Sequence, residues 1–161
     1  MMQNQNKPRR ILISGILLGL GIGGFFDGIV LHQILQWHHM LTSAGYPANT
    51  VENLELNTLA DGFFHAMTYF FTCLGIYGLW RSRQISVGDH ASRLLFGAIL
   101  VGWGLFNLVE GFINHHILTI HHVRSGPNEV LWDIGFLAWG ALMLIGGLFL
   151  IKYVPSATLP D

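Results

Sequence analysis

The residues of this chain whose types could do chemistry form a pattern of acids and histidines that occurs twice. Residues 15–40 align without gaps with residues 98–123, each residue matching the one 83 positions later. The shared pattern is an acid, a glycine, a histidine and then a His-His pair. Its members are Asp27, His32, His38 and His39 in the first copy and Glu110, His115, His121 and His122 in the second. Imidazole and carboxylate together bind zinc, iron, copper(II) or manganese, so the repeat predicts a metal site.

A second apolar segment in each copy begins near one further acid, and the first copy also has a histidine there. Asp61 aligns with Asp133, at a spacing of 72 residues. His65 lies four residues after Asp61, on the same helical face, whereas Leu137 occupies the matching position in the second copy. Ionisable groups in a bilayer cost at least about 2.5 kcal/mol each, so they persist where they pair, meet water or hold a metal.

Helical geometry predicts two layers of ligands. His38 and His39 lie six and seven residues beyond His32, which places them about 10 Å further out along a helix. The inner layer comprises Asp27, His32, Asp61, His65, Glu110 and His115. The outer layer comprises His38, His39, His121 and His122, which could capture metal or extend the site. Asp61 and Asp133 could be ligands or could orient histidines. One metal ion could not use both layers.

The composition identifies a membrane protein. Of 161 residues, 52% are hydrophobic and 11% are charged, whereas about a quarter are charged in a typical soluble domain. The mean hydropathy is +0.49. Four segments are long enough to cross a hydrocarbon core of about 30 Å, at about 11–33, 58–80, 93–116 and 130–152. We therefore expect an all-α fold, a single membrane domain over 1–161.

The repeat predicts how these four transmembrane helices are organised. Repeat one covers about 11–80 and repeat two about 93–152, and each is a two-helix hairpin, so the repeats run parallel in a four-helix bundle. All basic residues except Arg124 flank the same ends of the segments. The positive-inside rule then places the N and C termini in the cytoplasm, and every histidine except His90 on the extracytoplasmic side of the inner cell membrane.

Composition also limits the partners. Cys73 is the only cysteine, which excludes disulfides and cysteine-rich metal sites. The formal net charge of -1 and the lack of basic runs give no reason to expect nucleic acid. The lipid bilayer is the expected environment. A ridge of Gly15, Gly19 and Gly23 could support a homodimer or a larger membrane complex.

The motifs FFDGIVLHQILQWHH and LVEGFINHHILTIHH, with LADGFFH and WDIGF opening the second helix of each repeat, resemble a family of small bacterial membrane proteins. That family is catalogued only as a domain of unknown function. The likeness covers about residues 11–152. It implies a four-helix membrane fold and gives no role to any residue.

The sequence favours an integral membrane protein that binds copper, iron or zinc at an outward-facing histidine and carboxylate site. Metal handling in the envelope and metal-based redox chemistry are both consistent with it. A membrane hydrolase or oxidoreductase remains an alternative, so the sequence does not decide whether the protein is an enzyme. His32 and His115 could instead hold a haem for electron transfer. A metal-free proton path, a structural salt-bridge network and an assembly partner stay open as well.

Overall fold

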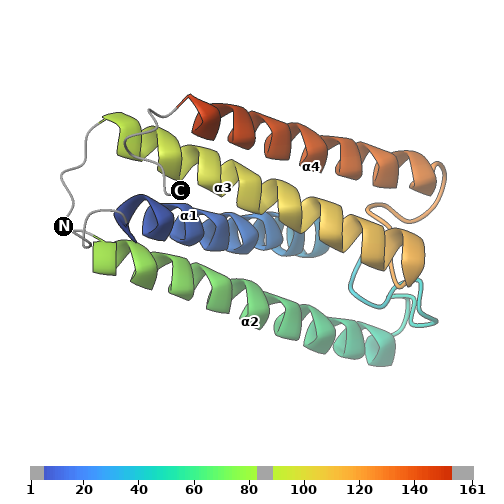
Figure 1. Ribbon diagram of the computed structural model, residues 1–161. Coiled ribbons are helices and arrows are strands. Elements are labelled where there is room, and N and C mark those ends of the chain that lie inside the picture. The colour runs from blue at the N-terminus through green and yellow to red at the C-terminus, as the bar shows by residue number, and fades with distance from the viewer. Residues whose placement is uncertain (1–5, 83–88, 154–161) are drawn as a thin grey trace.

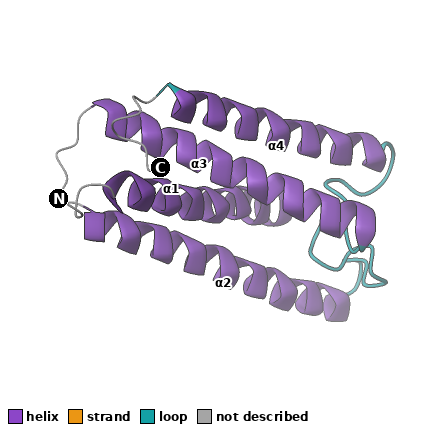
Figure 2. Cartoon of the chain, in the orientation of Figure 1, coloured by secondary structure: helices purple, strands orange, loops and turns teal. Residues whose placement is uncertain are grey.

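A computed structural model describes residues 6–82 and 89–153, and all regular structure within them is helical (Figure 2). The six helical elements are α1 (Asn6–Phe25), η1 (Phe26–Ile34), α2 (Val51–Ser82), α3 (Asp89–Glu110), η2 (Gly111–Ile117) and α4 (Glu129–Lys152). The two π-helices, η1 and η2, continue α1 and α3 without a break, so the chain forms four long helices. The predicted all-α class is confirmed.

The four helices lie side by side in the order α2, α1, α3, α4 (Figure 1). α1 and α3 pack along each other at the centre, α2 packs on α1, and α4 packs on α3. α1 and α3 run in the same direction, and α2 and α4 run back. The two hairpins therefore stand in matching positions, as the two sequence repeats do.

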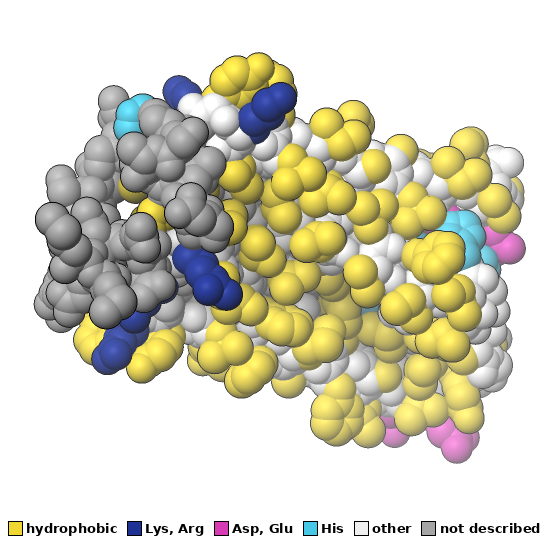
Figure 3. Space-filling model, viewed as in Figure 1, with side chains coloured by type: hydrophobic (Ala, Val, Ile, Leu, Met, Phe, Trp, Pro, Cys, Tyr) yellow, Lys and Arg dark blue, Asp and Glu magenta, His cyan; other side chains and the backbone are white. Residues whose placement is uncertain are grey.

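Three helical segments are long and apolar enough to cross a membrane, namely Pro8–Ile34, His90–Ile117 and Glu129–Lys152. These correspond to three of the four predicted crossings. α2 is not among them, since threonine, tyrosine and histidine residues within it lower its hydropathy. Hydrophobic side chains nevertheless cover the middle of the bundle, with basic groups towards one end and histidine and acids at the other (Figure 3). This distribution is that of a multi-pass membrane protein.

Glycines bring the two central helices into backbone contact. A Cβ atom on Gly19 would lie 2.1 Å from the carbonyl oxygen of Ile99, and one on Gly102 would lie 2.1 Å from that of Ile16. Gly19 and Gly102 occupy the same position in the two repeats, as do Ile16 and Ile99. Small residues allow such close approach between membrane helices. Each repeat thus contributes the same glycine and the same carbonyl group to the contact, as a two-fold relation between the repeats would require.

The same contact changes the interpretation of the glycine ridge. A Cβ atom on Gly15 would lie 2.5 Å from Cβ of Ala98, and one on Gly23 would lie 2.8 Å from the Trp103 ring. The ridge therefore packs against α3 of its own chain. The second repeat covers the ridge that was expected to support a homodimer, so a homodimer stays a prediction that would need another surface.

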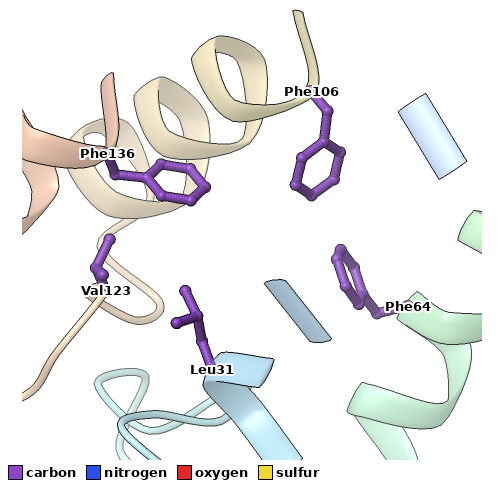
Figure 4. Close-up of a cluster of buried hydrophobic side chains, with 5 residues drawn as sticks. All are labelled: Leu31, Phe64, Phe106, Val123 and Phe136. Carbon is purple, nitrogen blue, oxygen red and sulfur yellow. The ribbon is translucent and has the colours of Figure 1, made fainter. Parts of the chain in front are cut away.

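An apolar cluster lies between the histidine-bearing ends of the helices. It consists of Leu31, Phe64, Phe106, Val123 and Phe136, drawn from both repeats (Figure 4). Phe64 stacks on the imidazole of His32 at a centroid distance of 5.7 Å, and Phe136 lies 5.5 Å from that of His115. Phe64 and Phe136 are aligned residues of the repeats. They fix equivalent histidine rings from equivalent sides.

Candidate metal centre

The acid and the first histidine of each repeat lie where the helix widens into a π-helix. In a π-helix residue i bonds to residue i+5, so residues five apart stack on one side, whereas an α-helix would turn them about 140° apart. Asp27 and His32 are five apart, and Oδ2 of Asp27 lies 3.3 Å from Nε2 of His32. Oε1 of Glu110 lies 3.4 Å from Nε2 of His115. The widened turns thus place each acid beside its histidine.

After each π-helix the chain turns back towards the centre of the helix bundle. Gln36 has a φ of 49° and Thr119, its aligned residue, a φ of 47°, a left-handed conformation that is uncommon outside glycine. The turn brings the first histidine of each His-His pair beside the π-helical histidine. The ring centroids of His32 and His38 are 4.2 Å apart, and those of His115 and His121 are 4.9 Å apart.

The prediction of two separate layers was therefore wrong. It assumed that the helices continue to the His-His pairs, but they end at Ile34 and Ile117. The rings of His38 and His121 stack on each other at 4.7 Å with an interplanar angle of 7°. Histidines from both supposed layers and both repeats thus form one group. We call Asp27, His32, His38, Glu110, His115 and His121 the central cluster.

The imidazoles of the central cluster are withdrawn from solvent. Their residues are at most 2% exposed. Donor atoms of His32, His38 and His121 lie within 4.8 Å of one another, and so do those of Glu110, His115 and His121. Oδ1 of Asp27 lies 4.0 Å from Nε2 of His38, which joins this acid to the first group. Such spacings would let either group close around a metal ion with small movements.

Asp61 and Asp133 orient the histidines from outside the cluster. Asp61 accepts hydrogen bonds from Nδ1 of His32 at 2.9 Å, from Nδ1 of His39 at 2.7 Å and from the backbone N–H of Met40 at 2.9 Å. A bond of this kind at Nδ1 fixes the ring so that Nε2 is free to bind a metal. Of the two roles left open by the sequence, the geometry favours orientation.

Asp133 repeats this arrangement in the second half. It accepts hydrogen bonds from Nδ1 of His122 at 2.6 Å and from the backbone N–H of Val123 at 2.9 Å, and it lies 3.3 Å from Nδ1 of His115. Met40 and Val123 are aligned residues of the two repeats. The outer histidines, His39 and His122, thus hold the orienting acids and lie beyond the central cluster.

The two stacked histidines are oriented by the opposite repeat. Nδ1 of His38 lies 2.8 Å from the carbonyl oxygen of Val123, and Nδ1 of His121 lies 3.2 Å from that of Met40. Sequence reasoning missed these two carbonyl groups. Their matching positions directly after the His-His pairs were the only signal that pointed to them.

Unpartnered polar atoms gather at the centre. Within the described residues, the buried side-chain atoms that lack a hydrogen-bond partner include both carboxylate oxygens of Asp27 and the Nε2 atoms of His32, His38 and His115. Buried polar groups are nearly always hydrogen-bonded, so a converging set without partners indicates a place for a bound ion or water. Burial and the imidazoles of His32 and His121 hold the pKa of His38 well below its usual value. That ring is therefore neutral at neutral pH, the form that binds metal.

His65 does not join the central cluster. Its Nδ1 lies 2.8 Å from the carbonyl oxygen of Asp61, one turn earlier in α2, and its ring stacks on Phe25. Nε2 faces Gly28, where an added Cβ atom would lie 2.6 Å away. The predicted place of His65 among the inner ligands is corrected, because the side chain turns along α2 into the contact with η1.

Residues 14–153 match the family described as "Predicted membrane protein (DUF2243)". The chain belongs to this family. The match covers both repeats and the whole central cluster, and it confirms the resemblance noted from the motifs. No match was found among curated proteins or among solved structures. The family description names a membrane protein and no activity, so the function must be argued from the site.

Proposed function

We propose that all four helices cross the inner membrane, with both termini in the cytoplasm and the central cluster near the extracytoplasmic surface. α1 and α3 both run towards the cluster, so the chain must return between them, and α2 is the element that does so. α2 also exposes large apolar side chains, including Phe63 at 71%. Basic residues at the opposite end of the bundle support the orientation, namely Arg9, Arg10, Arg81, Arg93 and Lys152.

We propose further that the central cluster is a transition-metal centre. The observation that carries this proposal is the orientation of the imidazoles: groups outside the cluster face Nδ1 of each ring, and Nε2 turns inward beside a carboxylate. Metal-binding histidines have this arrangement in proteins. Imidazole and carboxylate without thiolate suit zinc, iron or copper(II).

The packing of the cluster favours metal ions that are bound directly by the side chains over a haem group. The four rings follow one another at centroid distances of 4.2, 4.7 and 4.9 Å. A porphyrin placed between any two of them would occupy the space of the others. The burial of every donor residue, at most 7% exposed, favours a resident centre for redox or small-molecule chemistry over a site that passes metal on.

Elemental analysis of the detergent-purified protein, before and after reconstitution with copper, iron or zinc, tests the metal proposal. We expect bound metal in the wild type and its loss in the double variant His38→Gln/His121→Gln, which removes both stacked rings. His116→Gln is the matched control, because His116 is exposed and adjoins a cluster residue. Full occupancy in the double variant, or wild-type protein that takes up none of the three metals, would contradict the proposal.

A proton path is the second candidate, and one observation favours it. His39, Asp61, His32 and Asp27 form a continuous chain from the outer end to the centre, with successive distances of 2.7, 2.9 and 3.3 Å. Chains of acids and histidines carry protons in membrane pumps. Metal-free protein that dissipates a pH gradient across vesicles, and an Asp61→Asn variant that does not, would support this function instead.

A further inference from the structure

The donors of the central cluster divide into two equivalent sets. Each repeat supplies one acid and two histidines, and the sets are Asp27, His32, His38 and Glu110, His115, His121. In the first, the carboxylate lies 3.3 and 4.0 Å from the two Nε2 atoms, and in the second 3.4 and 2.9 Å. Two histidines and one carboxylate are a recognised set for one metal ion, with coordination positions left open.

The order of the rings keeps the two sets apart. His38 and His121 stack at the centre, and His32 and His115 lie on their outer sides. Within the described residues, the donors that lie within 4.8 Å of one another form two groups, which share His121, whereas His32 and His115 fall in different groups. A single ion holds nitrogen donors at about 2.0–2.1 Å. It could not bind both His32 and His115 without a rearrangement of the cluster.

The buried carboxylates of the region divide between the repeats as the ligand sets do. Four buried carboxylates lie in or beside the cluster, those of Asp27, Asp61, Glu110 and Asp133. Among the described residues, the cationic partners recorded for them are all imidazoles. In repeat one, Asp27 belongs to the ligand set and Asp61 lies beside it at Nδ1 of His32. In repeat two, Glu110 belongs to the ligand set and Asp133 lies beside it at Nδ1 of His115. The two sets therefore have matching acids around them.

We propose that the centre holds two divalent transition-metal ions, each bound by the acid and the two central histidines of one repeat. The inference rests on the proposed metal function, because it needs the cluster to bind metal at all. It adds the number of ions and the division of ligands between them. Two neighbouring ions can act together on one small oxygen-containing ligand, which a lone ion cannot do.

The metal-to-protein ratio after reconstitution with Cu²⁺ tests the division. We expect two ions per chain in the wild type and one in each half-site variant, Asp27→Asn/His32→Gln and Glu110→Gln/His115→Gln. The variant with all four changes should hold none. His65→Gln should keep two, since His65 lies outside the cluster. Wild-type protein that saturates at one ion would overturn this inference and leave the metal function standing, whereas a lack of binding would overturn both.

Electron paramagnetic resonance of the wild-type protein tests the proposal even if the variants do not fold. Cu²⁺ added to the wild type should give the spectrum of isolated ions at low loading, and magnetic coupling between two ions as the second equivalent binds. Each half-site variant that folds should show the isolated spectrum at saturation. Two bound ions without coupling at full loading would place the second ion away from the central cluster and would overturn the inference.

Discussion

The two repeats build the same ligand set but surround it differently. In repeat one, Asn57 is fully buried, accepts a hydrogen bond from the backbone N–H of Leu41 at 2.9 Å and donates one to the carbonyl of Tyr46 at 2.8 Å. Glu129, the aligned residue of repeat two, has a side chain that is 44% exposed and lies 3.9 Å from Nε2 of His122. In repeat one, Asn57 therefore holds the loop before α2 by hydrogen bonds. In repeat two, the same position carries an acid at the surface. The repeats therefore share the centre and differ at the outer end.

The largest difference between the repeats is expected from their orienting acids. Asp61 accepts four hydrogen bonds, whereas Asp133 accepts two. Each buried donor left without a partner costs about 1–3 kcal/mol. Asp61→Ala should lower the free energy of unfolding of the metal-free protein by roughly 4 kcal/mol or more, and Asp133→Ala by roughly half of that.

Denaturant unfolding in detergent, followed by circular dichroism, checks this order. Glu129→Ala is the control and should change the free energy of unfolding little, because its side chain is largely exposed. A larger loss of unfolding free energy for Asp133→Ala than for Asp61→Ala would contradict the order that the hydrogen bonds of the two acids indicate.

Equal effects are expected where the repeats meet. Gly19→Ala and Gly102→Ala each place a Cβ atom 2.1 Å from a backbone oxygen of the opposite helix. Overpacking of this kind costs about 1–3 kcal/mol, and the same loss of thermal stability should appear in both variants. Gly62→Ala is the control, since no atom lies within 4 Å of an added Cβ there. Clearly unequal losses would argue against a symmetric crossing.

The difference in access predicts a kinetic effect. Glu129→Gln should slow metal uptake by up to about tenfold at low salt without changing the final occupancy, because a surface charge next to a site chiefly affects association. Stopped-flow mixing with Cu²⁺ measures the rate. Glu52→Gln removes an exposed acid from the start of α2 in repeat one and should have little effect. Equal slowing in both variants would mean that metal does not approach through repeat two.

The smallest effect is expected at Arg124. Its guanidinium lies 5.3 Å from the ring centre of Trp37 and 5.5 Å from that of Trp132, and Leu41 is its aligned residue in repeat one. Arg124→Leu should reduce stability by about 0.5–1 kcal/mol, the range of an exposed cation–π contact. Thermal unfolding measures it, with Arg124→Lys as the variant that keeps the charge. No change in either variant would show that the contact is not needed to hold the loop.

Most of the helix positions could be predicted because hydropathy and basic residues mark them directly. Glu129–Lys152 was expected at about 130–152. The start of α2 was predicted less well: the helix begins at Val51, before the apolar segment. Thr50 accepts a hydrogen bond from the backbone N–H of Asn53 at 3.2 Å and so caps a polar first turn, which a hydropathy criterion does not detect.

The candidate site was found by its residue types and misplaced by an assumption about geometry. A regular helix puts Asp27 and His32 about 140° apart, but the π-helix puts them in contact. The five-residue spacing of acid and histidine in both repeats was the available signal. The chain reversals at Gln36 and Thr119 had no such signal, because neither residue is a glycine. Local backbone conformation, and not ligand chemistry, limited the prediction.

The exchanged contacts of the stacked histidines bear on how such a protein could arise. His38 depends on the carbonyl of Val123, and His121 on that of Met40, so a lone two-helix unit would lack the group that holds its own central histidine. An ancestor of half this length could complete its centre only by pairing with an identical copy. Fusion of two such genes would then keep the two units together in one chain. The residues at the outer end of each unit could afterwards diverge.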